Sequence, residues 1–416
     1  ANMEVAVLSC AFALAPRALP QPQPQPQRTR TIVMVAPEMS SLEATIGRAT
    51  ATTATRSVVR RFRPDQGWLW RQWEGTATQL TWRPVLGSSA LSVGVVTAAR
   101  LCSDDPWPWL EVPPATDPLV EKFLGLNTAW GYELTLTTFI LTFFVGQAYT
   151  HWRACYVNAR DIQGRCDDMN LLLSLKAVRE GAGYSDEARE LLETCARYTR
   201  LAHLFFWSSV TPRREADGSL AGVKTFTKYY CTELGTPEGL EQLVACGELT
   251  VAERDSLLAA ALPSSQYAFV LLEWWGLRVF EATERGVLNT NNALEGQVFQ
   301  LMMRLRANFA ETDNLRVGRL PFQYVHIVQL LVDSLLVVAP FALWPKIGAV
   351  AVVLSAGLTF FYAGLLELGK SFLDPYGVEG TEQNIRIDTL MSEVNFGALR
   401  WTIAGSVLPE QVRQGP

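Results

Sequence analysis

The sequence predicts an all-α membrane protein with four transmembrane helices and a large helical soluble portion. Of its 416 residues, 49% are hydrophobic and 19% are charged, which is less charged than the ~25% typical of soluble proteins. Apolar stretches at 134–150, 327–344 and 347–366 are each about long enough to cross ~30 Å of hydrocarbon as a helix. Residues 160–315 instead carry apolar positions at three- and four-residue spacing, which is typical of amphipathic helices, and no strand alternation interrupts them.

The first 65 residues have the composition of a targeting presequence followed by a disordered, Pro-rich linker. A short apolar run, VAVLSCAFALA, precedes the repeat PQPQPQPQ, and a tract rich in Ser, Thr, Ala and Arg follows. A signal-like segment followed by a transit-like one indicates a two-part presequence. SCAFALAP is similar to the cleavage region of such presequences in algae with complex plastids, so we expect a plastid protein. The alternative is a disordered Pro-rich tail.

Residues 66–155 should hold an interfacial helix and the first two spans. The segment from Gly67, GWLWRQWEGTATQLTW, is rich in Trp, which prefers the membrane interface. A first span is predicted at Pro84–Leu101, and residues 102–131 form an acidic, Pro-rich loop. The second span belongs to a helix that starts at Glu133, becomes basic by Arg160 and continues to about Lys176.

The remainder divides into three further parts. Residues 156–317 form the helical soluble portion, with helix starts at Ser185 and Thr250. Residues 318–372 hold the third and fourth spans, joined by a tight turn at Trp344-Pro345-Lys346, and 373–416 return to water as a soluble segment. Loop charges favour both termini and the soluble portion on the basic side of the membrane.

The residue types that most often carry catalysis show no pattern typical of an enzyme site. The three His and seven Cys have no zinc spacing, and the sequence has no nucleotide-binding or hydrolase motif. We therefore expect no enzyme, free buried thiols and, at a net charge of −5, no nucleic-acid partner. His151 could act in ion passage or pH response, and His326 in an interfacial hydrogen bond. Asp333 lies inside the third span, where an acid is functional or pairs with a hydroxyl or His at a helix contact.

The second span offers two equivalent apolar faces. Thr135, Phe139 and Phe143 lie at i, i+4 and i+8 on one face, and Leu136, Ile140 and Phe144 make the neighbouring face. Periodicity does not decide which of them lines a pore and which packs on other helices.

Three segments carry a resemblance to a known family. They are FILTFFVGQAYTHW at 139–152, RLPFQYVHIVQL at 319–330 and TFFYAGLLELGKSFLDPYG at 359–377. Together they resemble the bestrophin family, including its plastid and bacterial members, over about residues 80–400. The resemblance implies a homopentameric, largely helical anion channel with a central pore.

The resemblance also implies the functional residues. The narrow neck falls on Thr135, Phe139 and Phe143, where Thr135 departs from the family's bulky apolar residue. A second constriction falls at Ala293 or Leu294. Animal members bind calcium after the Pro-Phe-Gly turn, and the matching ligands here would be Asp374, Glu379 and Glu382. This run is much less acidic than theirs and looks more like the plastid and bacterial pattern, so calcium is the less favoured alternative to no cofactor.

These observations predict a plastid anion channel in the thylakoid membrane, with its soluble portion facing the stroma. Chloride and bicarbonate are the expected permeant ions, and the expected partners are further copies of the chain and the lipid bilayer. The alternative is a non-conducting membrane scaffold or an accessory subunit of a larger assembly.

Overall fold

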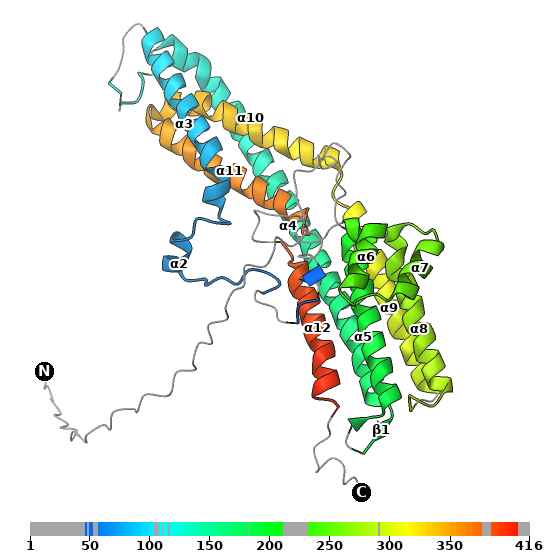
Figure 1. Ribbon diagram of the computed structural model, residues 1–416. Coiled ribbons are helices and arrows are strands. Elements are labelled where there is room, and N and C mark those ends of the chain that lie inside the picture. Colours follow the sequence, from blue (N-terminus) through cyan, green and yellow to red (C-terminus); the bar gives the residue numbers. More distant parts are fainter. Residues whose placement is uncertain are drawn as a thin grey trace, which may run out of the picture. The chain divides into compact units, whose positions relative to one another are not determined.

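The computed structural model describes residues 46–47, 50–52, 57–103, 108–109, 111–114, 117–181, 183–210, 232–289, 292–376 and 384–406. Within them the chain is mostly helical (Figure 1). Two-residue strands β1 (Arg179–Glu180) and β2 (Gly183–Tyr184) pair as an antiparallel hairpin. A hairpin this short leaves no alternation in the sequence, so the predicted all-α class needs only this small correction.

Four long helices form the membrane half, which we define as α3 (Ala77–Cys102), the first part of α4 (Pro118–Lys176), α10 (Phe322–Ile347) and α11 (Val350–Phe372). In the described part of the chain, α3, α10 and α11 are long and apolar enough to cross a membrane. Five Thr between Leu134 and Thr150 make α4 less apolar than these three helices. Nevertheless α4 packs along both α10 and α11.

Helix boundaries near the first span differ from the prediction. α2 (Gln66–Trp70) covers only the beginning of the predicted interfacial segment, which is therefore not one continuous helix. Instead α3 begins at Ala77, seven residues before the expected start, because the Thr76 side chain caps the backbone amide of Gln79. The predicted acidic loop at 102–131 is also shorter, since α4 begins at Pro118 with the Asp117 side chain as its cap.

The turn between α10 and α11 lies later than predicted. α10 continues through Pro345 to Ile347, and the chain reverses at Gly348, whose φ is 55° and ψ is −135°. Only Gly adopts this conformation readily. A Cβ atom at Gly348 would lie 2.5 Å from the main-chain oxygen of Glu111 and 3.4 Å from the Cα atom of Val112, so these two residues pack directly over the turn.

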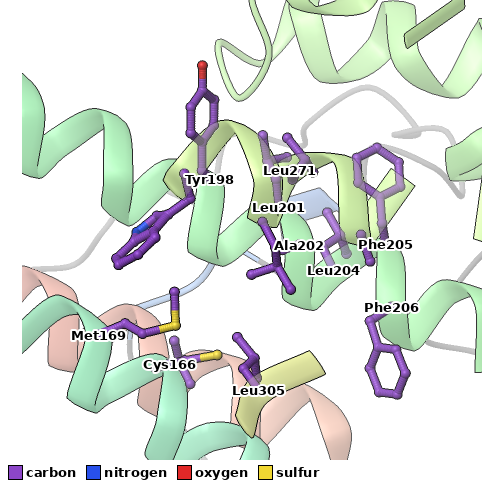
Figure 2. Close-up of a cluster of buried hydrophobic side chains, with 14 of the residues drawn as sticks. Cys166, Met169, Tyr198, Leu201, Ala202, Leu204, Phe205, Phe206, Leu271 and Leu305 are labelled. Carbon is purple, nitrogen blue, oxygen red and sulfur yellow. The ribbon is translucent and has the colours of Figure 1, made fainter. Parts of the chain in front are cut away.

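The soluble half is a helical bundle around α5. We define it as the second part of α4 with α5 (Asp186–Val210), α6 (Pro237–Ala245), α7 (Val251–Ala259), α8 (Tyr267–Glu284), α9 (Asn292–Val317) and α12 (Ile387–Ile403), plus the 3-10 turns Thr232–Gly235 and Ser264–Gln266. Figure 2 shows side chains of α4, α5, α8 and α9 meeting in its core, among them Met169, Phe206 and Leu305. The predicted helix start at Thr250 is confirmed by a complete capping box with Glu253.

Part of the predicted N-terminal linker belongs to this core. Ile46 is 2% exposed and Val58 is 7% exposed, and both join the apolar cluster of the soluble half. The Val58 carbonyl accepts a hydrogen bond from the Arg386 amide, and the Ala51 carbonyl accepts one from the Asn395 side chain. The folded chain therefore begins before residue 65, while the part of the predicted presequence at 1–45 lies outside the described residues.

The five thiols in the described part of the chain divide into two groups, while Cys10 and Cys231 lie outside it. Cys155, Cys166 and Cys195 are buried and free, as predicted, and burial raises the pKa of Cys195 to about 12. Such thiols are unreactive because the thiolate is the nucleophile. Cys102 and Cys246 are free but exposed, so the prediction of buried thiols is wrong for these two.

The contact between α4 and α12 holds a carboxyl group, that of Asp167, whose pKa is raised. A Cβ atom at Gly397 of α12 would lie 2.6 Å from Oδ1 of Asp167, an oxygen that is buried without a hydrogen-bond donor. Burial raises the pKa of Asp167 to about 7, and Asp168 and Glu393 add to the rise, while Arg400 and Arg160 oppose it. The folded chain therefore holds this proton up to near-neutral pH.

This raised pKa predicts a pH-dependent stability. The unfolded chain loses the Asp167 proton near pH 3.8 and the folded chain near pH 7, so the free energy of unfolding should decrease as pH rises between these values. Because the carboxyl is partly exposed and water screens it, we expect a decrease of about 1–2 kcal/mol, which Asp167→Asn should abolish. Thermal unfolding in detergent at pH 5 and pH 8 measures it. Asp255→Asn on α7 is the control, and an unchanged pH dependence in Asp167→Asn would contradict the assignment.

Candidate pore-lining face

The structure separates the two apolar faces of the second span. Phe139 is 72% exposed and Phe143 is 56% exposed, and Thr135 is exposed as well. On the neighbouring face, Phe144 is fully buried. Its ring packs edge-on against Tyr324 of α10, with ring centroids 6.0 Å apart, and against the backbone of Gly369 on α11. Phe144 therefore packs within the chain, although Leu136 of the same face is 51% exposed, whereas Phe139 and Phe143 are not buried by any of the described residues.

The unpartnered face continues along α4 in both directions. We call it the α4 stripe; its exposed residues are Thr128, Tyr132, Thr135, Phe139, Phe143, Gly146 and Thr150. The Thr135 and Thr150 hydroxyls donate to the carbonyls of Gly131 and Gly146, four residues earlier in the helix. Two Phe side chains are thus flanked on each side by hydroxyl groups, a polar–apolar–polar sequence along one helix face.

Contacts with α10 fix the depth of the stripe. Phe123 packs against Phe341 and Trp344, and the Trp130 indole donates to the Leu335 carbonyl at 3.0 Å. With Phe144 beside Tyr324, the part of α4 that follows α10 runs from about residue 123 to residue 144. Further along, Tyr149 and Trp152 pack against Phe372 at the end of α11, so the predicted span at 134–150 lies beside α10 and α11, and Glu133 lies midway along α10.

The predicted second constriction lies on another element. Ala293 and Leu294 belong to the first turn of α9, and Ala293 is exposed. α9 packs along the second part of α4. The two predicted constrictions are thus built on neighbouring helices that are far apart in the sequence.

The predicted calcium ligands are only partly described. Asp374 follows α11 and forms an ion pair with Arg319, with 3.3 Å between Nη2 and Oδ1. Glu379 and Glu382 lie outside the described residues. In the part of the chain that the structure describes, no three His, Cys, Asp or Glu side chains gather so that they could hold a metal ion.

The polar residues singled out in the spans have local partners. His151 lies 3.7 Å from the Cys155 sulfur, and the His326 ring stacks on Phe322. Asp333 accepts from the Gln329 amide and not from a hydroxyl or His, which corrects the expected pairing. Sequence reasoning missed Glu133, which accepts from Ser334 Oγ; its place between two apolar runs was the available signal.

Comparison with solved structures gives the fold. A crystal structure of a bacterial bestrophin homolog from Klebsiella pneumoniae with one substitution is 13% identical, at a TM-score of 0.56 over 77% of this chain and 97% of that chain. Another, with a different substitution, is 13% identical, at 0.55 over 79% and 99%. A crystal structure of a membrane protein is 14% identical, at 0.54 over 76% and 97%.

Sequence comparison gives the family. No curated protein sequence matches the chain significantly. The model of the family described as bacterial/fungal bestrophin proteins matches residues 182–397 of the 416, which is more than half of the chain. The chain therefore belongs to the bestrophin family, whose members are anion channels.

Proposed function

We propose that the chain forms a homopentameric channel for chloride or bicarbonate, in which the first part of α4 is the second of four membrane spans and the α4 stripe lines the pore. The observation that carries this proposal is the exposure of Phe139 and Phe143 on a face flanked by hydroxyl groups. Lipid would favour an apolar face along its whole length, whereas a water-filled path suits hydroxyls at both ends.

The two Phe positions suit a neck for anions. Five Phe side chains around an axis leave a narrow apolar ring that can close by loss of water. The edges of aromatic rings are the positive part of their quadrupole, so tilted rings tolerate an anion better than a cation. Thr135 would form the polar end of this neck, and Ala293 or Leu294 the second constriction.

Self-association is supported by exposed apolar side chains in the soluble half, where lipid cannot cover them. Leu175 on α4 is 67% exposed and Phe299 on α9 is 55% exposed, both in the soluble half. Beside them a hollow of about 280 Å³ opens between the two helices, lined by Leu171, Leu172, Leu175 and Leu301 with polar side chains at its edge. Exposed apolar surface of this kind marks a protein interface, and we assign it to neighbouring copies.

The location proposed is the thylakoid membrane of a plastid, with the soluble half in the stroma. It is supported by the composition of the segment before Ile46 and by the basic residues on the side of the soluble half. Calcium binding at Asp374, Glu379 and Glu382 stays a prediction. The Arg319 guanidinium already neutralises Asp374, which lowers the demand for a cation there.

A planar bilayer recording tests the proposal. We expect the purified chain to pass current whose reversal potential follows chloride and bicarbonate gradients. Phe139→Ala combined with Phe143→Ala should raise the anion conductance at least several-fold, because removing both rings widens and wets the neck. Phe361→Ala is the matched control, since this side chain is 64% exposed on α11, away from the stripe.

Two results would contradict the proposal. Absence of anion current in both the parent chain and the double variant would favour the non-conducting scaffold. A native mass other than five chains would count against the pentamer, whether or not current is seen.

A further inference from the structure

Two carboxylates lie at a similar depth in the middle of the membrane half. Glu133 of α4 accepts a hydrogen bond from Ser334 Oγ of α10. The adjacent residue on α10, Asp333, is exposed and accepts from Gln329 Nε2 with both of its oxygens, each at 2.8 Å. Because Asp333 and Ser334 are neighbours in the helix, the two acids lie at the same depth. We call Glu133 and Asp333 the acidic pair, and Ser334 and Gln329 are its hydrogen-bond partners.

Their depth follows from the position of Asp333 in α10. This helix has 26 residues from Phe322 to Ile347. At 1.5 Å per residue, Asp333 lies about 17 Å from one end and about 21 Å from the other. The acidic pair is therefore far from both membrane surfaces if α10 spans the bilayer.

No basic side chain can reach the acidic pair at that depth. The sequence has no Lys or Arg in residues 84–99, 123–152, 322–345 or 350–366, which are the central parts of the four long helices. His326 lies two helical turns away on α10, on the side of the soluble half. A second copy of the chain brings the same four segments, so it cannot supply a salt bridge either.

An ionisable group without a counter-charge is strongly disfavoured against hydrocarbon and marks a water-filled path by default. One hydroxyl and one amide satisfy only part of the acceptor capacity of two carboxylates. Water on the exposed side of Asp333 would supply the missing hydrogen bonds and let the carboxylate keep its charge. This inference about water beside Asp333 does not depend on whether the protein conducts ions.

We propose that the acidic pair lines a water-filled vestibule that enters from the side opposite the soluble half, ends at the neck, and opposes the entry of anions. Glu133 precedes Thr135 by two residues and Phe139 by six, so an anion would meet the carboxylates about 9 Å before the first Phe ring. Negative charge there lowers the local anion concentration and raises that of cations. The effect on conduction rests on the proposed function, whereas the water-filled vestibule does not.

Thiol labelling in liposomes tests the vestibule without any need for current. In Ser334→Cys, with the modified peptide identified by mass spectrometry, membrane-impermeant methanethiosulfonates should react from the side opposite the soluble half. The cationic reagent should react about tenfold faster than the anionic one, and Asp333→Asn should reduce that preference. Leu330→Cys, on the same face of α10, is a second reporter if the first variant does not fold. Phe361→Cys on the apolar face of α11 is the unreactive control.

Bilayer recordings test the effect on anions. Glu133→Gln and Asp333→Asn should each raise the chloride conductance and the ratio of chloride to potassium permeability, while Asp255→Asn should change neither. Reporter thiols as unreactive as that of Phe361→Cys would overturn the vestibule. Labelling without charge preference, or unaltered permeability in both neutralised variants, would overturn the electrostatic role. Charge-dependent labelling in a chain that passes no current would support the wet acidic vestibule and reject the proposed channel.

Discussion

Gly348→Ala should strongly destabilise the membrane half. The φ of 55° and ψ of −135° at Gly348 disfavour any side chain, and the new methyl group would lie 2.5 Å from the Glu111 oxygen. Strained backbone alone costs about 1–3 kcal/mol, and a collision with main-chain atoms adds to that because neither segment can rotate away. We expect a loss of about 3 kcal/mol or more in the free energy of unfolding, measured by thermal unfolding in detergent.

Gly357→Ala provides the matched control. Gly357 lies within α11, and a Cβ atom there would meet nothing within 4 Å. Ala is favoured over Gly in a helix interior by about 0.5–1 kcal/mol, so this variant should be unchanged or slightly stabilised. Equal unfolding temperatures for the two variants would contradict the geometry of the turn.

Phe309→Ala should have a comparable effect on the soluble half. Phe309 of α9 is fully buried and stacks on Phe206 of α5, with ring centroids 4.0 Å apart and planes 11° from parallel. It also meets Phe269 of α8 edge-on at 6.2 Å. Because one ring joins three helices, its truncation should cost about 3–5 kcal/mol. Chemical unfolding followed by Trp fluorescence measures the change.

Phe309→Leu separates lost packing from lost apolar area. It keeps most of the buried volume and should lose clearly less stability than Phe309→Ala. A cost below about 1 kcal/mol for Phe309→Ala would show that α9 does not depend on this contact.

The sequence predicts the helical class because its periodic signals are local. α10 and α11 follow directly from uninterrupted apolar runs, and the helix start at Thr250 follows from a capping box contained in four residues. The first part of α4 is harder to recognise. Its Thr residues and Glu133 dilute the apolar signal, so the predicted helix start at Glu133 lies 15 residues after the observed start at Pro118.

The choice between the two faces of α4 needs distant partners. Phe144 is buried by Tyr324 and Gly369, which follow it in the sequence by about two hundred residues. The same limit applies to Ile46 and Val58. Their segment has the composition of a presequence, and only contact with the core of the soluble half shows that it is folded.

The unbroken course of α4 has a mechanical consequence. This helix has 59 residues and no Pro after its first position, so the commonest cause of a sharp kink is absent between the Phe rings of the stripe and the segment that packs on α9 and α12. Rotation of such a rod about its own axis turns all of its side chains together. If α4 transmits such a rotation, a molecule that twists it where Arg160 pairs with Glu393 would swing Phe139 and Phe143, and so would act on the proposed neck from the soluble half.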